Sequence, residues 1–284
     1  MNTKFSPFLS VLLCGLLVAS SLPAQTPKVE FPAPSPACTL KQSVGLTDIE
    51  IVYSRPGVKG RQIFGSVVPY GAVWRTGANN ATKITFSTPV KINGADIPAG
   101  SYSLYTIPGE TEWTVIINKK TGQSGTQYDE KSDLVRFKAV PGKLAETIHS
   151  FMIEFNGISD ESAVLLLAWE HTFVPLKIEV ELTSKLVPQI EAVMASDATS
   201  KPYYQAAMFY YDHGQDLDKA KKWVDAAIAQ REAHYIVYLK AKILAKQGDK
   251  AGAIAAAKRS TELAVKAGDT GYVKMNDDLI AGLK

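Results

Sequence analysis

The residues best suited to chemistry lie between Glu50 and Asp96, an interval that contains no acidic side chain. Its cationic residues are Arg55, Lys59, Arg61, Arg75, Lys83 and Lys91. Arginine forms bidentate hydrogen bonds with carboxylates and phosphates, and the glycines of the same stretch let backbone N–H groups approach a ligand closely. We therefore predict an anion-binding face with aromatic platforms. Its candidate ligand-binding residues are Arg55, Lys59, Arg61, Tyr70, Trp74, Arg75 and Asn79, with Trp74 and Tyr70 as the platforms.

Two turns, at residues 55–57 and 75–77, each follow a short apolar segment. Antiparallel pairing would bring both turns to one end of a β-sandwich, where loops usually carry binding sites, so we expect Arg55, Arg61 and Arg75 to lie near one another. The alternative is a structural role, which is the commoner use of arginines inside a fold. In that case the three would pair with acids such as Asp129, Glu130 and Asp133.

No catalytic template fits the remaining polar residues. The four histidines lack metal-ligand spacing, and the Walker, G-x-S-x-G and G-x-G-x-x-G motifs are missing. The sequence therefore assigns no catalytic residue, and it predicts no metal or cofactor. Several carboxylates lie between residues 110 and 133: Glu110, Glu112, Asp129, Glu130 and Asp133. A glycosidase needs two carboxyl groups about 5 Å apart or somewhat more, so a hydrolase acting on glycans is kept as the alternative.

The N-terminus has the features of a secretory signal peptide, which we place at residues 1–24. Lys4 precedes a short apolar run at 8–19, and small residues follow at Ser21 and Ala24, where cleavage is expected. We expect a periplasmic or secreted protein with no membrane span after cleavage, since no other run is long enough. An uncleaved anchor is the less favoured alternative. Removal of Cys14 leaves Cys38 alone, so no internal disulfide is expected.

Composition and turn signals divide the mature chain into two parts. The formal net charge of +3 is too small to indicate a nucleic-acid partner. A proline-rich leader is predicted at 25–37. Residues 38–182 are predicted to form a β domain, because about nine short strands alternate there with turn residues. The first strand is predicted at 49–53 and the last two at 163–169 and 173–182. Asn93-Gly94 between two short strands is a strong hairpin signal. This pattern predicts an antiparallel β-sandwich or jelly roll.

Residues 183–284 change to helical periodicity and are predicted to form an α-helical tail. Helices are expected at 186–194, 203–213, 217–230, 233–246, 250–266 and 272–283. Asp216 and Asp249 are expected to cap the helices that follow them, and Gly248 to end the helix before it. Gly214 and Gly248 are 34 residues apart, and Ala220 and Ala253 are 33 apart, a spacing that resembles tetratricopeptide repeats. Because two repeats rarely suffice for stability, we expect the flanking helices to cap them, or the unit to dock on the sandwich.

Three segments carry a resemblance to a known family: YSRPGVKGRQIFGSVVPYGAVWRTGANNATKITF, IPAGSYSLYTIPGETEWTVIINK and LAWEHTFVPLKIEV. Over residues 38–181 the chain closely resembles a family of exported bacterial proteins, domain of unknown function family 2911. The resemblance implies export and a compact β domain but no activity. Members often carry Glu where this chain has Asn80, and Trp in a longer loop where it has Ser124. These departures imply that any site using those positions is altered here.

The most favoured function is therefore a β-sandwich that binds a ligand or envelope component, followed by a helical interaction tail. Expected partners are an anionic small molecule or glycan and, through the tail, a protein.

Overall fold

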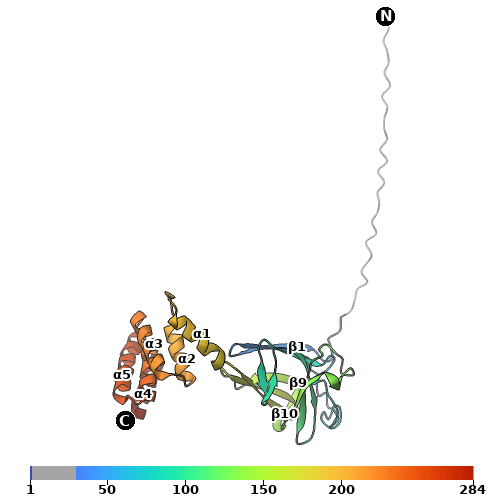
Figure 1. Cartoon of the computed structure of the whole chain (residues 1–284). Helices are drawn as coiled ribbons and strands as arrows, with labels where there is room; N and C mark the ends of the chain where they lie inside the picture. The colour runs from blue at the N-terminus through green and yellow to red at the C-terminus, as the bar shows by residue number, and fades with distance from the viewer. Residues whose placement is uncertain (2–29, 284) are drawn as a thin grey trace.

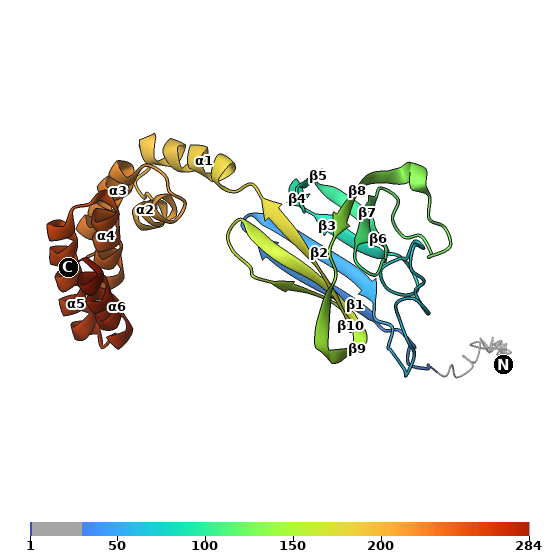
Figure 2. The same ribbon diagram turned by 90° about the horizontal axis from the view of Figure 1, so that it is seen from below.

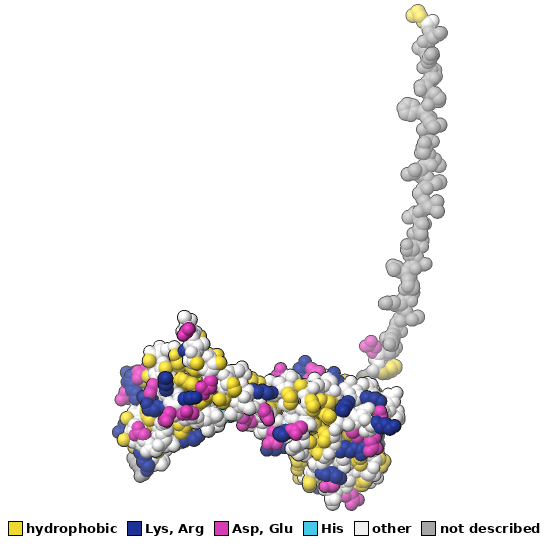
Figure 3. Space-filling view, viewed as in Figure 1, with side chains coloured by type: hydrophobic (Ala, Val, Ile, Leu, Met, Phe, Trp, Pro, Cys, Tyr) yellow, Lys and Arg dark blue, Asp and Glu magenta, His cyan; other side chains and the backbone are white. Residues whose placement is uncertain are grey.

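The computed structural model describes Met1 and residues 30–283 and shows two parts joined by a helix (Figure 1). Residues 2–29, which hold the predicted signal peptide after Met1 and the first five residues of the predicted leader, lie outside the described residues. Two antiparallel sheets are followed, in the described chain, by six helices, which confirms the predicted β-then-α arrangement. Figure 3 shows cationic and anionic side chains interspersed over both parts on the face drawn.

One sheet has six strands in the order β1-β2-β3-β6-β7-β8, and the other has four in the order β5-β4-β10-β9. The six strands are Ala37–Val44, Thr47–Ser54, Thr82–Phe86, Gly100–Ile107, Trp113–Asn118 and Asp133–Ala139. The four, in sheet order, are Ala95–Ile97, Val90–Ile92, Ser162–Val180 and Gly142–Asn156. A short 3-10 turn, Glu130–Ser132, precedes β8.

The sequence signals located most strands correctly. The predicted hairpin at Asn93-Gly94 is confirmed: Ile92 pairs with Ala95, and both turn residues have positive φ, of 46° and 82°. Two predictions were wrong in detail. The strand β1 was missed, and the segments predicted at 163–169 and 173–182 form one strand, β10, bent by register shifts around Glu170, whose φ is 56°.

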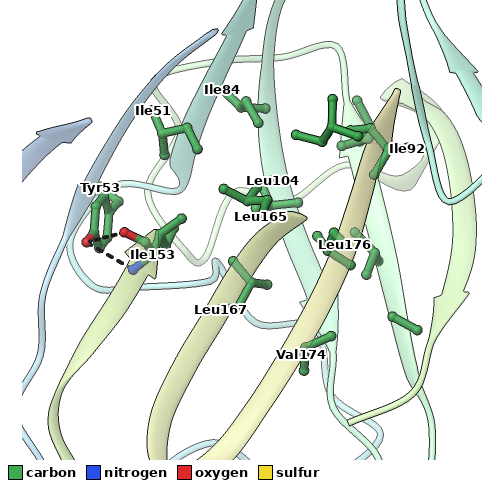
Figure 4. Packing of buried hydrophobic residues seen from close by; sticks show 14 of the residues in the cluster. Ile51, Tyr53, Ile84, Ile92, Leu104, Ile153, Leu165, Leu167, Val174 and Leu176 are labelled. Carbon is green, nitrogen blue, oxygen red and sulfur yellow. Dashed lines mark hydrogen bonds between the residues drawn. The ribbon is translucent and has the colours of Figure 1, made fainter. Parts of the chain in front are cut away.

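The sandwich core consists of the alternating inward side chains of both sheets. In β2, residues Ile49, Ile51 and Tyr53 are buried while their neighbours are more exposed. Figure 4 shows Ile51 from one sheet and Leu165 from the other among the same cluster, and the Tyr53 hydroxyl bridging the sheets. That hydroxyl accepts from Ile153 N at 3.0 Å and donates to Ile153 O at 3.4 Å.

The tail begins with α1, which leads from the end of β10 to the other helices (Figure 2). The helices are α1 (Thr183–Ala195), α2 (Tyr203–Asp212), α3 (Leu217–Gln230), α4 (His234–Gln247), α5 (Lys250–Ala267) and α6 (Thr270–Leu283). Helix α2 packs on α3, and α4 packs on α5. The predicted caps are present: Asp216 accepts from two backbone N–H groups of α3, Asp249 accepts from one of α5, and Gly248 adopts φ 86° after α4.

Small residues at the 33-residue spacing lie between packed helices, since Ala220 and Ala253 are both fully buried. The flanking helices contribute to the tail's two apolar clusters, α1 through Ile190 and α6 through Leu279. Among the described helices, none is long and apolar enough to cross a bilayer.

Candidate functional site

A shallow cleft at the end of β2 gathers several of the predicted site residues. Arg55 and Lys59 line a space of about 260 Å³ together with Pro34, Pro36, Gly57 and Ser150. The chain continues past β2 as an extended segment that pairs with β9, because Val58 N donates to His149 O at 2.8 Å and Phe151 N donates to Pro56 O at 2.9 Å. The cleft therefore lies where the N-terminal segment, β2 and β9 meet.

Arg55 is held by the strand opposite it. Its Nε donates to Phe151 O at 3.0 Å, and its backbone N–H donates to Pro36 O at 2.9 Å. The terminal guanidinium nitrogens make no hydrogen bond with residues 30–283. One bond thus orients the guanidinium plane while its terminal nitrogens stay available.

Lys59, Arg61 and Asn79 belong to the same end of the sandwich. Lys59 has φ 50° and is exposed, and Arg61 closes the loop by donating to Val58 O at 3.1 Å and Gly57 O at 2.8 Å. The Asn79 amide donates to Ser54 Oγ at 3.1 Å and to Ser35 O, between the two prolines of the cleft, at 3.3 Å. Four of the seven predicted residues therefore lie in or beside one cleft.

Trp74 is a core residue, which corrects its expected role as an aromatic platform. Its side chain is only 9% exposed and stacks on Trp169 at a centroid separation of 5.8 Å. Phe64, Trp113 and Phe151 complete this aromatic cluster. Tyr70 remains exposed and packs over Gly65, in a different loop from the cleft.

Arg75 departs from the predicted cluster although its turn lies where expected. A Cβ on Gly77 would sit 3.1 Å from Ser54 O, so the two turns are side by side. Trp74 and Thr106 exchange backbone hydrogen bonds of 2.7 and 2.9 Å. Because successive side chains of an extended segment alternate, Trp74 enters the core and Arg75 leaves on the outer face of the six-stranded sheet. Arg75 therefore does not join Arg55 and Arg61.

The ion-pair alternative for these arginines is wrong. Asp129 pairs with Lys120 at 2.6 Å, while Glu130 and Asp133 pair with Arg136 at 2.9 and 2.7 Å. Within residues 30–283, Arg55, Arg61 and Arg75 form no ion pair. Hydrogen bonds from Lys120, Ser132 and the backbone of Lys131 lower the pKa of Asp129, the opposite of what a general acid requires.

Sequence reasoning did not predict how the loop at residues 119–129 packs on the sheet. This loop covers the outer face of β6 and β7: Tyr128 packs edge-on to the buried Tyr105 at 4.9 Å, and the Asn118 amide donates to Asp129 O at 2.9 Å. Burial, and then the charge of Asp133, raise the pKa of Tyr105. Alternation along β6 could have flagged Tyr105 as an outward aromatic, but no local signal placed the loop over it.

The two departures from the family pattern, Asn80 and Ser124, lie where this loop contacts the segment before β3. Asn80 and Ser124 form an isolated antiparallel bridge, and Ala81 N donates to Gln123 O at 2.9 Å. Positions 80 and 124 are therefore neighbours in space. Within the described chain, no three His, Cys, Asp or Glu side chains are grouped as a metal site would require.

Fold and cleft together define a two-sheet antiparallel β protein with a cationic cleft and a helical tail. The chain belongs to the family described as Protein of unknown function (DUF2911), whose pattern matches residues 35–178. Neither the curated proteins nor the solved structures that were searched gave a match.

Proposed function

We propose that this protein is exported and that its β domain binds a ligand through an anionic group, a carboxylate or phosphate, at the cleft of Arg55 and Lys59. One observation carries the proposal. Two cations line one cleft with no ion-pair partner among residues 30–283, while the acids that the alternative would pair with Arg55 are engaged by Lys120 and Arg136.

An anion in the cleft would gain charge-assisted hydrogen bonds. Such bonds contribute roughly 1.5–3 kcal/mol each before desolvation costs, and the oriented guanidinium of Arg55 suits a bidentate contact. Arg61 supports the site indirectly by fixing the loop that presents Lys59. The glycan-hydrolase alternative has no comparable support, because Glu112 pairs with Lys138 at 2.8 Å and Asp129 and Asp133 are also paired.

The helical tail is proposed to contact a protein partner as a tetratricopeptide-like unit. The buried small residues at a 33-residue spacing and the paired packing of α2 with α3 and of α4 with α5 support this. Export rests on the apolar run and small residues before Ala24. Cell fractionation with mass spectrometry of the mature N-terminus tests it, and an intact Met1 on a cytoplasmic protein would refute it.

The cleft is tested by isothermal titration calorimetry of the protein with inorganic phosphate and with succinate. Lys59→Asn removes one cation, and Asn tolerates the positive φ of this position. We expect at least a tenfold loss of affinity for the preferred anion with little change in stability.

Lys138→Asn is the matched control, since it removes an exposed cation that pairs with Glu112 away from the cleft. An equal loss in both variants would mean that only overall charge matters. If wild-type protein bound neither anion, the proposed cleft function would be wrong.

A further inference from the structure

Buried polar atoms without partners are concentrated in one place outside the cleft. In the described chain six buried side-chain nitrogen or oxygen atoms have no hydrogen-bond partner, and four of them share this region. The four are Arg75 Nε, Ser103 Oγ, Tyr105 OH and Gln123 Oε1. Native structures pair nearly all such atoms, so a group of them needs a physical explanation.

The four atoms lie between the outer face of the six-stranded sheet and the loop at 119–129. Because Trp74 pairs with Thr106, Arg75 lies opposite Tyr105 and shares its face. Ser103 is two residues along β6 on that same face, roughly 7 Å further, and both Ser103 and Tyr105 are fully buried. Gln123 is tied to this region through the backbone bond from Ala81.

Gly125 lies directly against the Arg75 guanidinium. A Cβ at this position would overlap Arg75 Nη1, so the side chain rests directly on the loop backbone. The loop turns at Gly122, whose φ is 76°, and is anchored near its end by the Tyr128 hydroxyl, which donates to Asp133 at 2.7 Å. Gly125 lies over Arg75, Tyr128 lies over Tyr105, and Asn118, which pairs with Ser103, donates to Asp129 O at 2.9 Å. The loop at 119–129 therefore covers this face.

We propose that this loop-covered face is a second ligand site and that it takes a hydroxylated carboxylic acid. The Arg75 Nε–H is a cationic donor that suits a carboxylate oxygen. Gln123 Oε1 only accepts, so it requires a donor such as a ligand hydroxyl. Ser103 and Tyr105 hydroxyls donate or accept, and their spacing along β6 fits an extended polyhydroxy chain.

Binding at this site requires the loop at 119–129 to move away from the sheet. The covered arrangement leaves the four polar atoms without the hydrogen bonds that water or a ligand would supply, which favours such movement. The site is independent of the cleft, because Arg55 and Lys59 line the space at the end of β2 and Arg75 does not.

The test follows the Nε–H signal of Arg75 by ¹⁵N–¹H NMR of the full chain during titration with D-gluconate. Two six-carbon compounds serve as matched probes: sorbitol lacks the carboxylate, and hexanoate lacks the hydroxyls. We expect gluconate to shift the Arg75 signal and the Gly125 amide at a concentration at least tenfold lower than either control. Equal responses to all three compounds would overturn the proposal.

Tyr105→Phe and Ser103→Ala separate binding from stability. Each removes a buried hydroxyl that has no partner in the described chain, so the melting temperature is expected to stay the same or rise while gluconate binding weakens at least fivefold. Gly125→Ala should displace Arg75 and abolish its gluconate response. Lys59→Asn should leave that response unchanged, which distinguishes this site from the cleft. Wild-type gluconate affinity in Tyr105→Phe, or a clear loss of its stability, would contradict the proposal.

Discussion

The side chains of neighbouring residues in the cation-rich stretch lie on opposite sides of the sheet because the backbone is extended there. Trp74 enters the aromatic core and Arg75 lies on the outer sheet face. Composition alone grouped them, since Trp and Arg both occur in binding sites. The alternation that separates them depends on the pairing of Trp74 with Thr106, a contact between residues 32 positions apart that no local pattern shows.

Trp74→Ala is predicted to lower the free energy of unfolding of the β domain by about 3–5 kcal/mol, because it empties space in a packed aromatic cluster. Chemical denaturation followed by tryptophan fluorescence measures this. Tyr70→Ala is the control and should cost no more than about 1 kcal/mol, as its side chain is 39% exposed. If both variants lowered the free energy of unfolding by a similarly small amount, Trp74 would not be a core residue.

Element-level predictions succeeded where a pattern was local. The strands with apolar alternation, the Asn93-Gly94 hairpin and the helix caps at Asp216 and Asp249 were all found. The strand β1 was missed because, as an edge strand, it buries little: only Val44 is fully buried. The packing of the 119–129 loop over β6 was missed because turn residues predict where a loop begins and ends but not what it packs against.

The spacing of small residues in the tail predicts where bulk is not tolerated. Ala253→Leu should destabilise the tail by about 1–3 kcal/mol through overpacking, since Ala253 is fully buried in the α4–α5 cluster. Ala255→Leu, on the exposed side of the same helix, is the matched control and should have little effect. Thermal melts at 222 nm compare them, and equal effects would show that residue 253 does not form a helix contact.

Glu191 links α1 to the next two helices and gives the tail a pH dependence. Hydrogen bonds from Lys219, and then from Tyr210, both at 2.6 Å, lower the pKa of Glu191. A carboxyl group with a lowered folded-state pKa stabilises the fold above its unfolded pKa of about 4.3 and loses this contribution as pH falls further.

Glu191→Gln should therefore melt below wild type at pH 7, and the difference should shrink as pH falls below about 4. Melting temperatures across a pH series measure this. Asp277→Asn is the control, because Asp277 is exposed and makes no hydrogen bond or ion pair with the described residues. A gap between Glu191→Gln and wild type that is the same at pH 3 and pH 7 would show that the Glu191 charge is not involved.

At the scale of the whole molecule, the apolar clusters respect the boundary between the two parts. The sandwich cluster draws its residues from Cys38 to Val180, whereas the tail clusters begin at Val187. The side-chain contacts across the junction include His213 Nε2 and Asp160 Oδ2 at 3.7 Å. The Asp160 side chain is 75% exposed, so a contact at this distance adds little. Helix α1 therefore joins two units that bury their apolar surfaces separately.

This separation predicts that the two units unfold independently. Residues 30–182 and 183–284, expressed alone, should each melt cooperatively, the first with a β spectrum and the second with a helical one. Two repeats would be marginal by themselves, but α1 and α6 cover their ends through Ile190 and Leu279. Calorimetry of the full chain should show two transitions at the fragments' own temperatures. A single transition well above both would mean that the units stabilise each other, and an unfolded tail fragment would mean that its helices depend on the sandwich.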